Sequence, residues 1–242
     1  MKINQFSRKR SIPIREDFTG YTETDVPADK IAVVKHTITL TAGDRDEDYY
    51  VTKDYGADYF GNFTHWVDVN VTSLTNDAAS IMYVWALSDG KVGATPAEPD
   101  DLKDIDDDGG DFLVISVGLI VVGKYRVSVF SCNAGSVTQD YGTAEIAVNT
   151  ASYLSVTRSG TTITVQIYST AALRVAGGAG DVETLTLTCV NTTFRYVYAL
   201  GSYNTGNAAK DISGTVSNLR LNGYSLPYRQ IGGMGTQLDS RW

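Results

Sequence analysis

The sequence predicts an all-β fold, an antiparallel sandwich or barrel, and three observations carry this prediction. The chain of 242 residues has 27 Thr, 24 Val and 14 Ile against 15 Leu and 6 Glu, and β-branched side chains favour strands. Of its 28 acidic residues, 22 are Asp, a residue of turns rather than of helix interiors. Short runs of alternating apolar and polar residues, bounded by Gly, Asn, Asp and Ser, recur throughout. This pattern indicates antiparallel strands rather than alternating strands and helices.

The expected strands follow one another closely along most of the chain. In order, they are 30–41, 63–73, 80–88, 112–122, 125–132, 153–159, 161–169, 183–190, 194–200 and 212–221. Ser159-Gly160 separates two of these runs and predicts a hairpin over 153–169, because Gly supplies the positive φ of a tight turn. The Pro- and Asp-rich segment 94–111 interrupts the strands, and we interpret it as a long excursion from a single domain.

The charge is distributed unevenly between the two ends and the body. The net charge of -8, from 20 Lys and Arg against 28 Asp and Glu, excludes a generic nucleic-acid binder, which is expected to be basic. Residues 1–15 carry +5 and no acid, while the rest carries -13, of which -7 lies in 98–111. No run approaches the ~20 apolar residues of a membrane span, and no apolar segment follows the basic start as in a secretory signal.

This asymmetry predicts a basic N-terminal arm (1–15), a sandwich (16–222) and a C-terminal tail (223–242) that gains glycines and loses the alternation. We expect Arg8, Lys9, Arg10 and Arg15 to dock on the acidic body of a neighbouring subunit or partner protein. The alternative is a solvated tail.

Three sequence segments resemble those of a known family: DYYVTKDYGADYFGNFTHWVDVNV (48–71), YLSVTRSGTTITVQIYS (153–169), and RYVYALGSYNTG followed by ISGTVSNLRL (195–221). They resemble segments of the concanavalin A-like lectin/glucanase superfamily. The predicted hairpin, 153–169, is similar to that of laminin-G and pentraxin relatives. The resemblance implies a jelly-roll sandwich of two antiparallel sheets. The sequences of these segments are also similar to those of concanavalin A-like domains on virion proteins of tailed phages.

The residues do not match the catalytic patterns of glucanase relatives. A retaining hydrolase needs two carboxylates about 5–5.5 Å apart, which such relatives supply from one strand as E-x-D-x-x-E or E-x-D-x-E. The six Glu are scattered, and the acidic run 44–48 contains no Glu pair. Both histidines, His36 and His65, lie in strand runs, without a G-x-S-x-G motif. We therefore expect a protein that is not an enzyme.

The segment 104–111 contains the best local motif for a metal. Asp104, Asp106 and Asp108 followed by Gly109 supply D-x-D-x-D-G, and Asp111 follows closely. Oxygen ligands at alternate positions and a Gly for the sharp turn suit calcium, but Ile115 stands where the bidentate Glu of a calcium loop is expected. Calcium is therefore a candidate cofactor, and an acidic solvated loop is the alternative.

Aromatic residues are the candidates for glycan binding. Alternation places Phe63, His65 and Val67 on one face of 63–73, and Trp66 on the opposite, polar face. Trp66, Tyr55 and Tyr59 are therefore candidate sugar-stacking residues, and packing at the core or sheet edge is the alternative. Cys132 and Cys189 lie in strand-like runs, and we expect them to be reduced and buried.

Two functions follow from these observations. The first is a non-enzymatic structural protein of a virion, such as a capsid decoration, head-fibre or tail-associated protein. It would be made in the host cytoplasm and would bind viral structural proteins and copies of itself through its arms. The second is a lectin-like carbohydrate-binding module that attaches to host or surface glycans.

Overall fold

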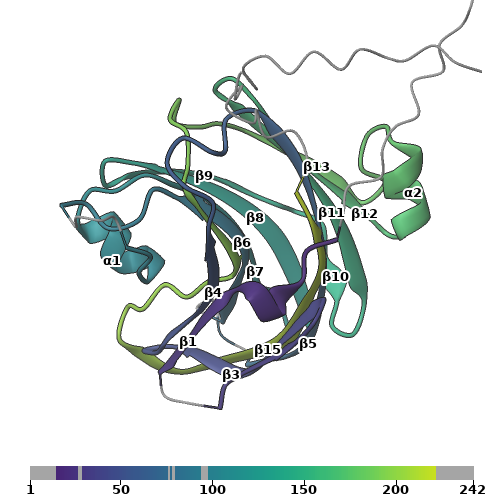
Figure 1. Cartoon of the computed structure of the whole chain (residues 1–242). Helices are drawn as coiled ribbons and strands as arrows, with labels where there is room; N and C mark the ends of the chain where they lie inside the picture. The colour runs from purple at the N-terminus through teal and green to yellow at the C-terminus, as the bar shows by residue number, and fades with distance from the viewer. Residues whose placement is uncertain (1–14, 27–28, 76, 78–79, 94–97, 222–242) are drawn as a thin grey trace, which may run out of the picture.

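The computed structural model describes residues 15–26, 29–75, 77, 80–93 and 98–221 and confirms the all-β prediction. Two sheets with antiparallel pairing are packed face to face (Figure 1). The eight-stranded sheet has the order β1 (Thr22–Val26), β4 (Asp48–Asp54), β14 (Tyr196–Leu200), β6 (Ile81–Ser88), β7 (Phe112–Val121), β8 (Lys124–Asn133) and β10 (Ile146–Ala147), and β9 (Ser136–Tyr141) also pairs with β8. The seven-stranded sheet has the order β13 (Glu183–Thr188), β12 (Thr162–Tyr168), β11 (Ala151–Ser159), β5 (Phe63–Leu74), β15 (Asn207–Arg220), β3 (Thr37–Arg45) and β2 (Ile31–Val34).

The main core lies between the two sheets, because each strand turns alternate side chains inward. In β5, Val67 and Val69 are buried against the facing sheet, which contributes Ile115 and Val117 from β7. The alternation read from 63–73 is thus confirmed, and the predicted hairpin is formed by β11 and β12. Its turn is centred one residue later than expected, since Ser159 pairs with Thr162.

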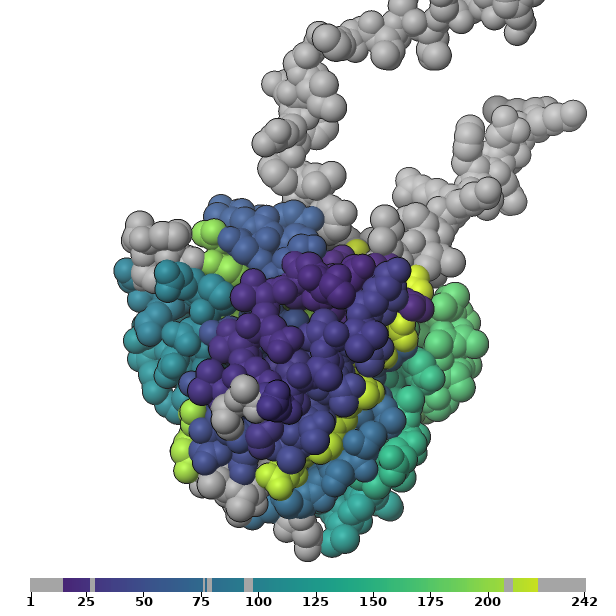
Figure 2. All heavy atoms as spheres, turned by 60° about the horizontal axis from the view of Figure 1, so that its bottom comes forward, coloured from purple at the N-terminus to yellow at the C-terminus, as the bar shows by residue number. Residues whose placement is uncertain are grey.

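The last strand lies next to the first strands of the chain. β15 is paired on one side with β5 and on the other with β3, and Figure 2 shows its yellow atoms beside the purple N-terminal segment. Arg15 forms an isolated bridge with Arg220, and the short helix η1 (Phe18–Gly20) follows. The two ends of the described chain therefore meet on one sheet.

Two short α-helices lie outside the sandwich (Figure 1). Helix α1 (Leu102–Asp107) lies in the interrupting segment and buries Leu102 and Ile105 in a second apolar cluster on the outer face of the eight-stranded sheet. Helix α2 (Ala171–Ala176) contacts β11 and β12 of the other sheet. Among the described residues, no helix has the length and apolar character needed to cross a membrane.

The predicted arms fall mostly outside the described residues. Arg8, Lys9 and Arg10 and the whole tail 223–242 belong to segments that the structure does not describe. Of the predicted assembly residues, only Arg15 is placed, and it lies beside this chain's own last strand. Docking on a neighbouring subunit therefore stays a prediction.

Candidate functional site

A pocket of about 300 Å³ opens on the outer face of the eight-stranded sheet. We call it the outer-face pocket. Its floor is formed by β6, β7 and β8, and its walls by β9, by the segment after β14 and by the end of β3. The residues that line it and are used below are Arg45, Tyr83, Ser116, Gly118, Arg126, Ser128, Phe130, Gln139, Tyr141 and Tyr203.

Small side chains from neighbouring strands form the floor. Ser116 and Ser128 are direct cross-strand partners, and Gly118 lies opposite Arg126. These side chains face outward because the residues between them, such as Val117, face the core. The floor is therefore low and polar, while bulkier side chains rise around it.

Two arginines line the pocket, Arg126 from β8 and Arg45 from the end of β3. The Arg126 guanidinium carbon lies 4.5 Å from the centroid of the Tyr141 ring, and that of Arg45 lies 5.8 Å from the centroid of Tyr203. Within the described part of the chain, neither arginine forms an ion pair with a carboxylate. The Arg45 Nε atom is shielded from solvent, and it has no hydrogen-bond partner among the described residues. Both guanidinium groups therefore have N–H donors that are available to an acceptor atom of a ligand.

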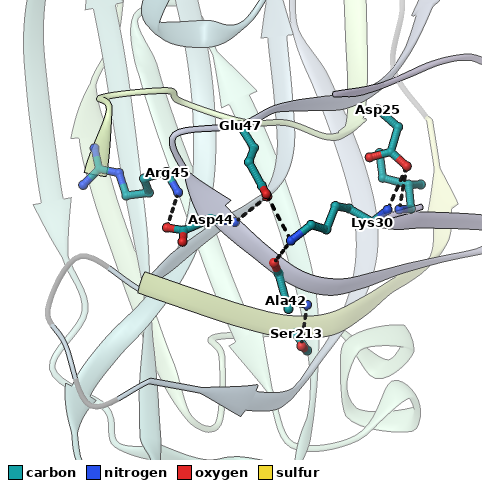
Figure 3. Close-up of polar contacts among 8 residues, drawn as sticks. Asp25, Lys30, Ala42, Asp44, Arg45, Glu47 and Ser213 are labelled. Atoms are coloured by element: carbon teal, nitrogen blue, oxygen red, sulfur yellow. Dashed lines mark hydrogen bonds and ion pairs between the residues drawn. The ribbon is translucent and has the colours of Figure 1, made fainter. Parts of the chain in front are cut away.

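The position of Arg45 is fixed by a polar cluster at the turn between β3 and β4 (Figure 3). Lys30 Nζ donates to the Ala42 carbonyl at 2.7 Å and pairs with Glu47 at 3.0 Å. Glu47 in turn accepts the Asp44 backbone N–H at 3.1 Å, and Asp44 accepts that of Arg45 at 2.7 Å. In Figure 3 the Arg45 side chain points away from this cluster. The carboxylates of Asp44 and Glu47 thus fix the backbone at Arg45, and the Arg45 guanidinium is available to line the pocket.

Aromatic rings form much of the remaining lining. Tyr83 and Tyr203 lie with their ring centroids 5.8 Å apart, and Phe130 packs edge-on against Tyr141 at 5.6 Å. The Tyr141 hydroxyl donates to Gln139 Oε1 at 2.8 Å. Burial raises the pKa of Tyr83 to about 12, an effect that the charge of Arg45 opposes. Tyr83 is therefore a neutral phenol at physiological pH.

Helix α1 lines no part of the pocket, but it is bonded to one of the lining residues, Tyr203. Its Asp106 accepts hydrogen bonds from the Tyr203 hydroxyl at 2.5 Å and from Cys132 Sγ at 3.1 Å. Asp101 caps the helix by accepting the Lys103 backbone N–H at 2.8 Å, and burial raises the pKa of this carboxyl. The acidic segment is thus a packed cover for the sheet.

This arrangement replaces the predicted calcium loop. Asp104 and Asp106 lie in α1, Asp108 pairs with Lys91 at 3.7 Å, and Asp111 accepts the backbone N–H of Ala134 at 2.9 Å. Across the described residues, no three acidic, cysteine or histidine side chains gather closely enough to hold a metal ion. The structure does not assemble the predicted site, because helix geometry and hydrogen bonding turn these carboxylates in different directions.

The three predicted sugar-stacking residues do not come together either. Tyr55 and Tyr59 pack on each other, with centroids 4.8 Å apart, at the edge of the main core. Trp66 lies on the outer face of the other sheet, where the Arg174 guanidinium carbon is 4.9 Å from its ring. None of the three lines the outer-face pocket.

Sequence reasoning missed the pocket residues because they are far apart in the chain. Arg45, Arg126 and Tyr203 come from the end of β3, from β8 and from the segment after β14. One local signal was available. In YRVSVFS, alternation places Arg126, Ser128 and Phe130 on one face, and an arginine there faces away from the core.

Comparison with known proteins bears on the fold. No family model and no curated protein sequence matches the chain. A functionally unknown protein from Saccharomyces cerevisiae has a similar structure, with a TM-score of 0.50 and 14% identity over 87% of this chain and 99% of that chain. Alginate lyase Aly36B, solved as a mutant with an alginate trisaccharide, gives a TM-score of 0.52 and 14% identity over 85% of this chain and 88% of that chain.

The chain has the concanavalin A-like jelly-roll fold. This confirms the fold that the sequence resemblance implied. A carbohydrate-binding module, CBM66 from Bacillus subtilis, also aligns, with a TM-score of 0.45 and 12% identity over 83% of this chain and 95% of that chain.

One expectation needs correction. The prediction that the protein is not an enzyme rested on the missing glucanase carboxylates. This prediction is wrong, because those carboxylates are not the test of an enzyme on this fold. The same fold is found in an alginate lyase, so the absence of a hydrolase pair does not separate enzymes from binding proteins on this fold.

Proposed function

We propose that the chain binds an anionic polysaccharide in the outer-face pocket. The observation that carries the proposal is the pair of arginines, Arg45 and Arg126, which line one pocket without a carboxylate partner in the described chain. The body around them is acidic. Two unpaired guanidinium groups in a hollow of such a body favour a ligand that brings its own negative charge.

The rest of the lining supports a sugar rather than a small inorganic ion. Tyr83, Tyr203 and Phe130 offer apolar ring surfaces, while Ser116 and Ser128 offer hydroxyls on the floor. Ligand sites commonly combine an apolar and aromatic lining with a few polar groups that fix orientation. Sugar rings present C–H faces and hydroxyls, and a uronate unit adds a carboxylate that an arginine binds through two parallel hydrogen bonds.

Titration calorimetry with oligosaccharides of a polyuronate and of a neutral β-glucan tests the proposal. We expect heat of binding with the polyuronate, weakened by added salt, and none with the neutral glucan. Arg126→Gln is expected to weaken binding about tenfold or more, because a hydrogen bond to a charged group contributes about 1.5–3 kcal/mol.

Arg195→Gln is the matched control, since it removes the same charge outside the pocket, where Arg195 pairs with Asp54 at 2.6 Å. Equal affinity of the wild-type protein and Arg126→Gln would contradict the proposal. The same mixtures are followed by ultraviolet absorbance for unsaturated uronate ends. Their appearance would show that the bound chain is also cleaved by elimination, and their absence would indicate binding alone.

A structural role in a virion stays a prediction. Its main support was the basic arm, and Arg8, Lys9 and Arg10 lie outside the described residues. Deleting the predicted arm, residues 1–15, and measuring the oligomeric state tests this role, with loss of assembly in a folded protein as the expected result. A monomer both before and after the deletion would contradict it.

A further inference from the structure

The floor of the outer-face pocket changes its chemistry along the strands. Strand pairing arranges its side chains in rows, because paired residues lie side by side and residues two positions apart share a face. Arg126 of β8 pairs with Gly118 of β7 in one row. In the next row, Ser128 pairs with Ser116 on one side and with Tyr141 of β9 on the other. A guanidinium and three hydroxyl groups therefore lie in two neighbouring rows.

The following rows are apolar except for one amide. Phe130 of β8 pairs with Val114 of β7 and with Gln139 of β9. Phe112 and Val137 lie one row further along β7 and β9. All five of these side chains line the outer-face pocket. We call them the apolar end of the pocket.

The other polar groups near the apolar end are bonded to one another. The Tyr203 hydroxyl and Cys132 Sγ both donate to Asp106, at 2.5 and 3.1 Å. Gln139 accepts the Tyr141 hydroxyl at its Oε1 atom. The Gln139 Nε2 atom forms no hydrogen bond within the described chain, and this side chain is exposed. The apolar end therefore offers a ligand an apolar surface and one amide N–H donor.

Part of this apolar surface is in contact with solvent. Val137 is 42% exposed, although Phe112 and Val114 in the same end of the pocket are buried. A ligand group that covers Val137 removes apolar area from water, which is favourable. A hydroxyl group placed against these side chains would instead lose hydrogen bonds to water.

We propose, building on the function proposed above, that the ligand is an acetylated acidic sugar, with its carboxylate at Arg126 and its acetyl group at the apolar end. Neighbouring rows are separated by two residues, or about 6.8 Å, so a single sugar unit with its substituents reaches from one row to the next. An acetyl group combines a carbonyl acceptor, which suits Gln139 Nε2, with a methyl group, which suits Val137 and Phe130. An O-acetyl ester and an N-acetyl amide present the same two groups.

Titration calorimetry on the full chain with three galacturonate oligosaccharides of equal length tests this proposal. The first is unsubstituted, the second is O-acetylated, and the third consists of N-acetylgalactosaminuronate units. We expect an acetylated form to bind about tenfold or more tightly than the unsubstituted form, because one small apolar group in a fitting site changes affinity by this factor. The form that binds more tightly of the two identifies the linkage as ester or amide.

Two variants in β9 test where the acetyl group lies. Val137→Ser and Gln139→Ala should each reduce the preference for the acetylated form several-fold, because they remove the apolar contact or the donor. Both side chains are exposed, so neither change disturbs the core. Val121→Ser is the matched control, since Val121 at the end of β7 is also 42% exposed and does not line the pocket. It should keep the full preference.

The outcomes separate this proposal from the one on which it rests. Equal affinity for all three oligosaccharides would overturn the acetyl proposal and leave the polyuronate site in place. Absence of binding with all three would overturn both. A preference that is unchanged in Val137→Ser and in Gln139→Ala would also overturn the acetyl proposal, because the group would then lie outside the apolar end.

Discussion

The Tyr203 hydroxyl donates a 2.5 Å hydrogen bond to Asp106 Oδ2, which joins a wall of the outer-face pocket to helix α1. The Tyr203 ring also lies beside the Arg45 guanidinium and the ring of Tyr83. One side chain therefore links the acidic cover of the sheet to the cationic group that we propose for ligand binding.

Tyr203→Phe keeps the ring and removes only this hydrogen bond. We expect the free energy of unfolding to fall by about 1.5–3 kcal/mol, because the Asp106 carboxylate loses a donor. Urea unfolding measures the change. Tyr141→Phe is the control, since among the described residues its hydroxyl bonds to Gln139 alone, on an exposed strand, and a change within about 0.5 kcal/mol is expected. Equal stability of the two variants would show that the Asp106 contact does not hold α1.

The two cysteines should be unreactive in the folded protein. Both are buried and free, as the sequence predicted. Burial, and then the hydrogen bond to Asp106, raise the pKa of Cys132 to about 12, and burial raises that of Cys189. Because the thiolate is the reactive form, a thiol reagent near neutral pH should label neither residue until denaturant is added. Rapid labelling of one thiol in the native protein would refute this.

Stability should decline in acid because of His65. Its ring is fully buried and stacks on Phe63 at 4.3 Å, and burial lowers its pKa to about 3. Below the unfolded pKa of about 6.5, the unfolded chain binds a proton that the folded chain does not. The free energy of unfolding should then fall by about 1.4 kcal/mol per pH unit as the pH drops from about 6.5 towards 3.

His65→Phe isolates this contribution. The difference in unfolding free energy between wild type and variant should be constant above about pH 6.5 and change steadily below it. Asp89, whose pKa burial raises to about 6, titrates in both proteins and cancels in the comparison. A difference that does not vary with pH would show that His65 is not the group responsible.

The pair of Arg174 and Asp68, whose Nη1 and Oδ1 atoms lie 2.6 Å apart, should be strongly coupled. Asp68 is 8% exposed, so Arg174→Met leaves its carboxylate buried without its cation, at an expected cost of about 3–5 kcal/mol. Adding Asp68→Asn should recover part of the loss, because the charge is then removed as well. Chemical unfolding of the single and double variants measures the coupling. Strictly additive losses would contradict it.

The fold could be predicted because its signal is local. In 63–73 and in the hairpin 153–169, strand alternation predicts on which face of the sheet each side chain lies. The structure places these side chains on the predicted faces. Helix α1 shows how a local signal can mislead. The pattern D-x-D-x-D-G suggested a metal loop, while Asp101 followed by Leu102 and Ile105 at helical spacing gave the competing cap and apolar face.

The pocket could not be predicted in the same way. Arg45 reaches it from a turn that is held by Lys30 and Glu47, and Tyr203 reaches it from a segment about 160 residues later in the chain. Only the pairing of β4, β14 and β6 brings these segments to one face. Sheet order is a non-local property, so no spacing in the sequence records it.

The most direct test of the central claim is to locate a polyuronate oligosaccharide on the isotope-labelled protein by backbone amide chemical shifts. The account predicts that the shifts gather on β7, β8 and β9 around Ser116, Ser128 and Tyr141, and that Arg126→Gln greatly weakens them. Shifts confined to the seven-stranded sheet around Trp66, or none at concentrations that saturate binding, would contradict it.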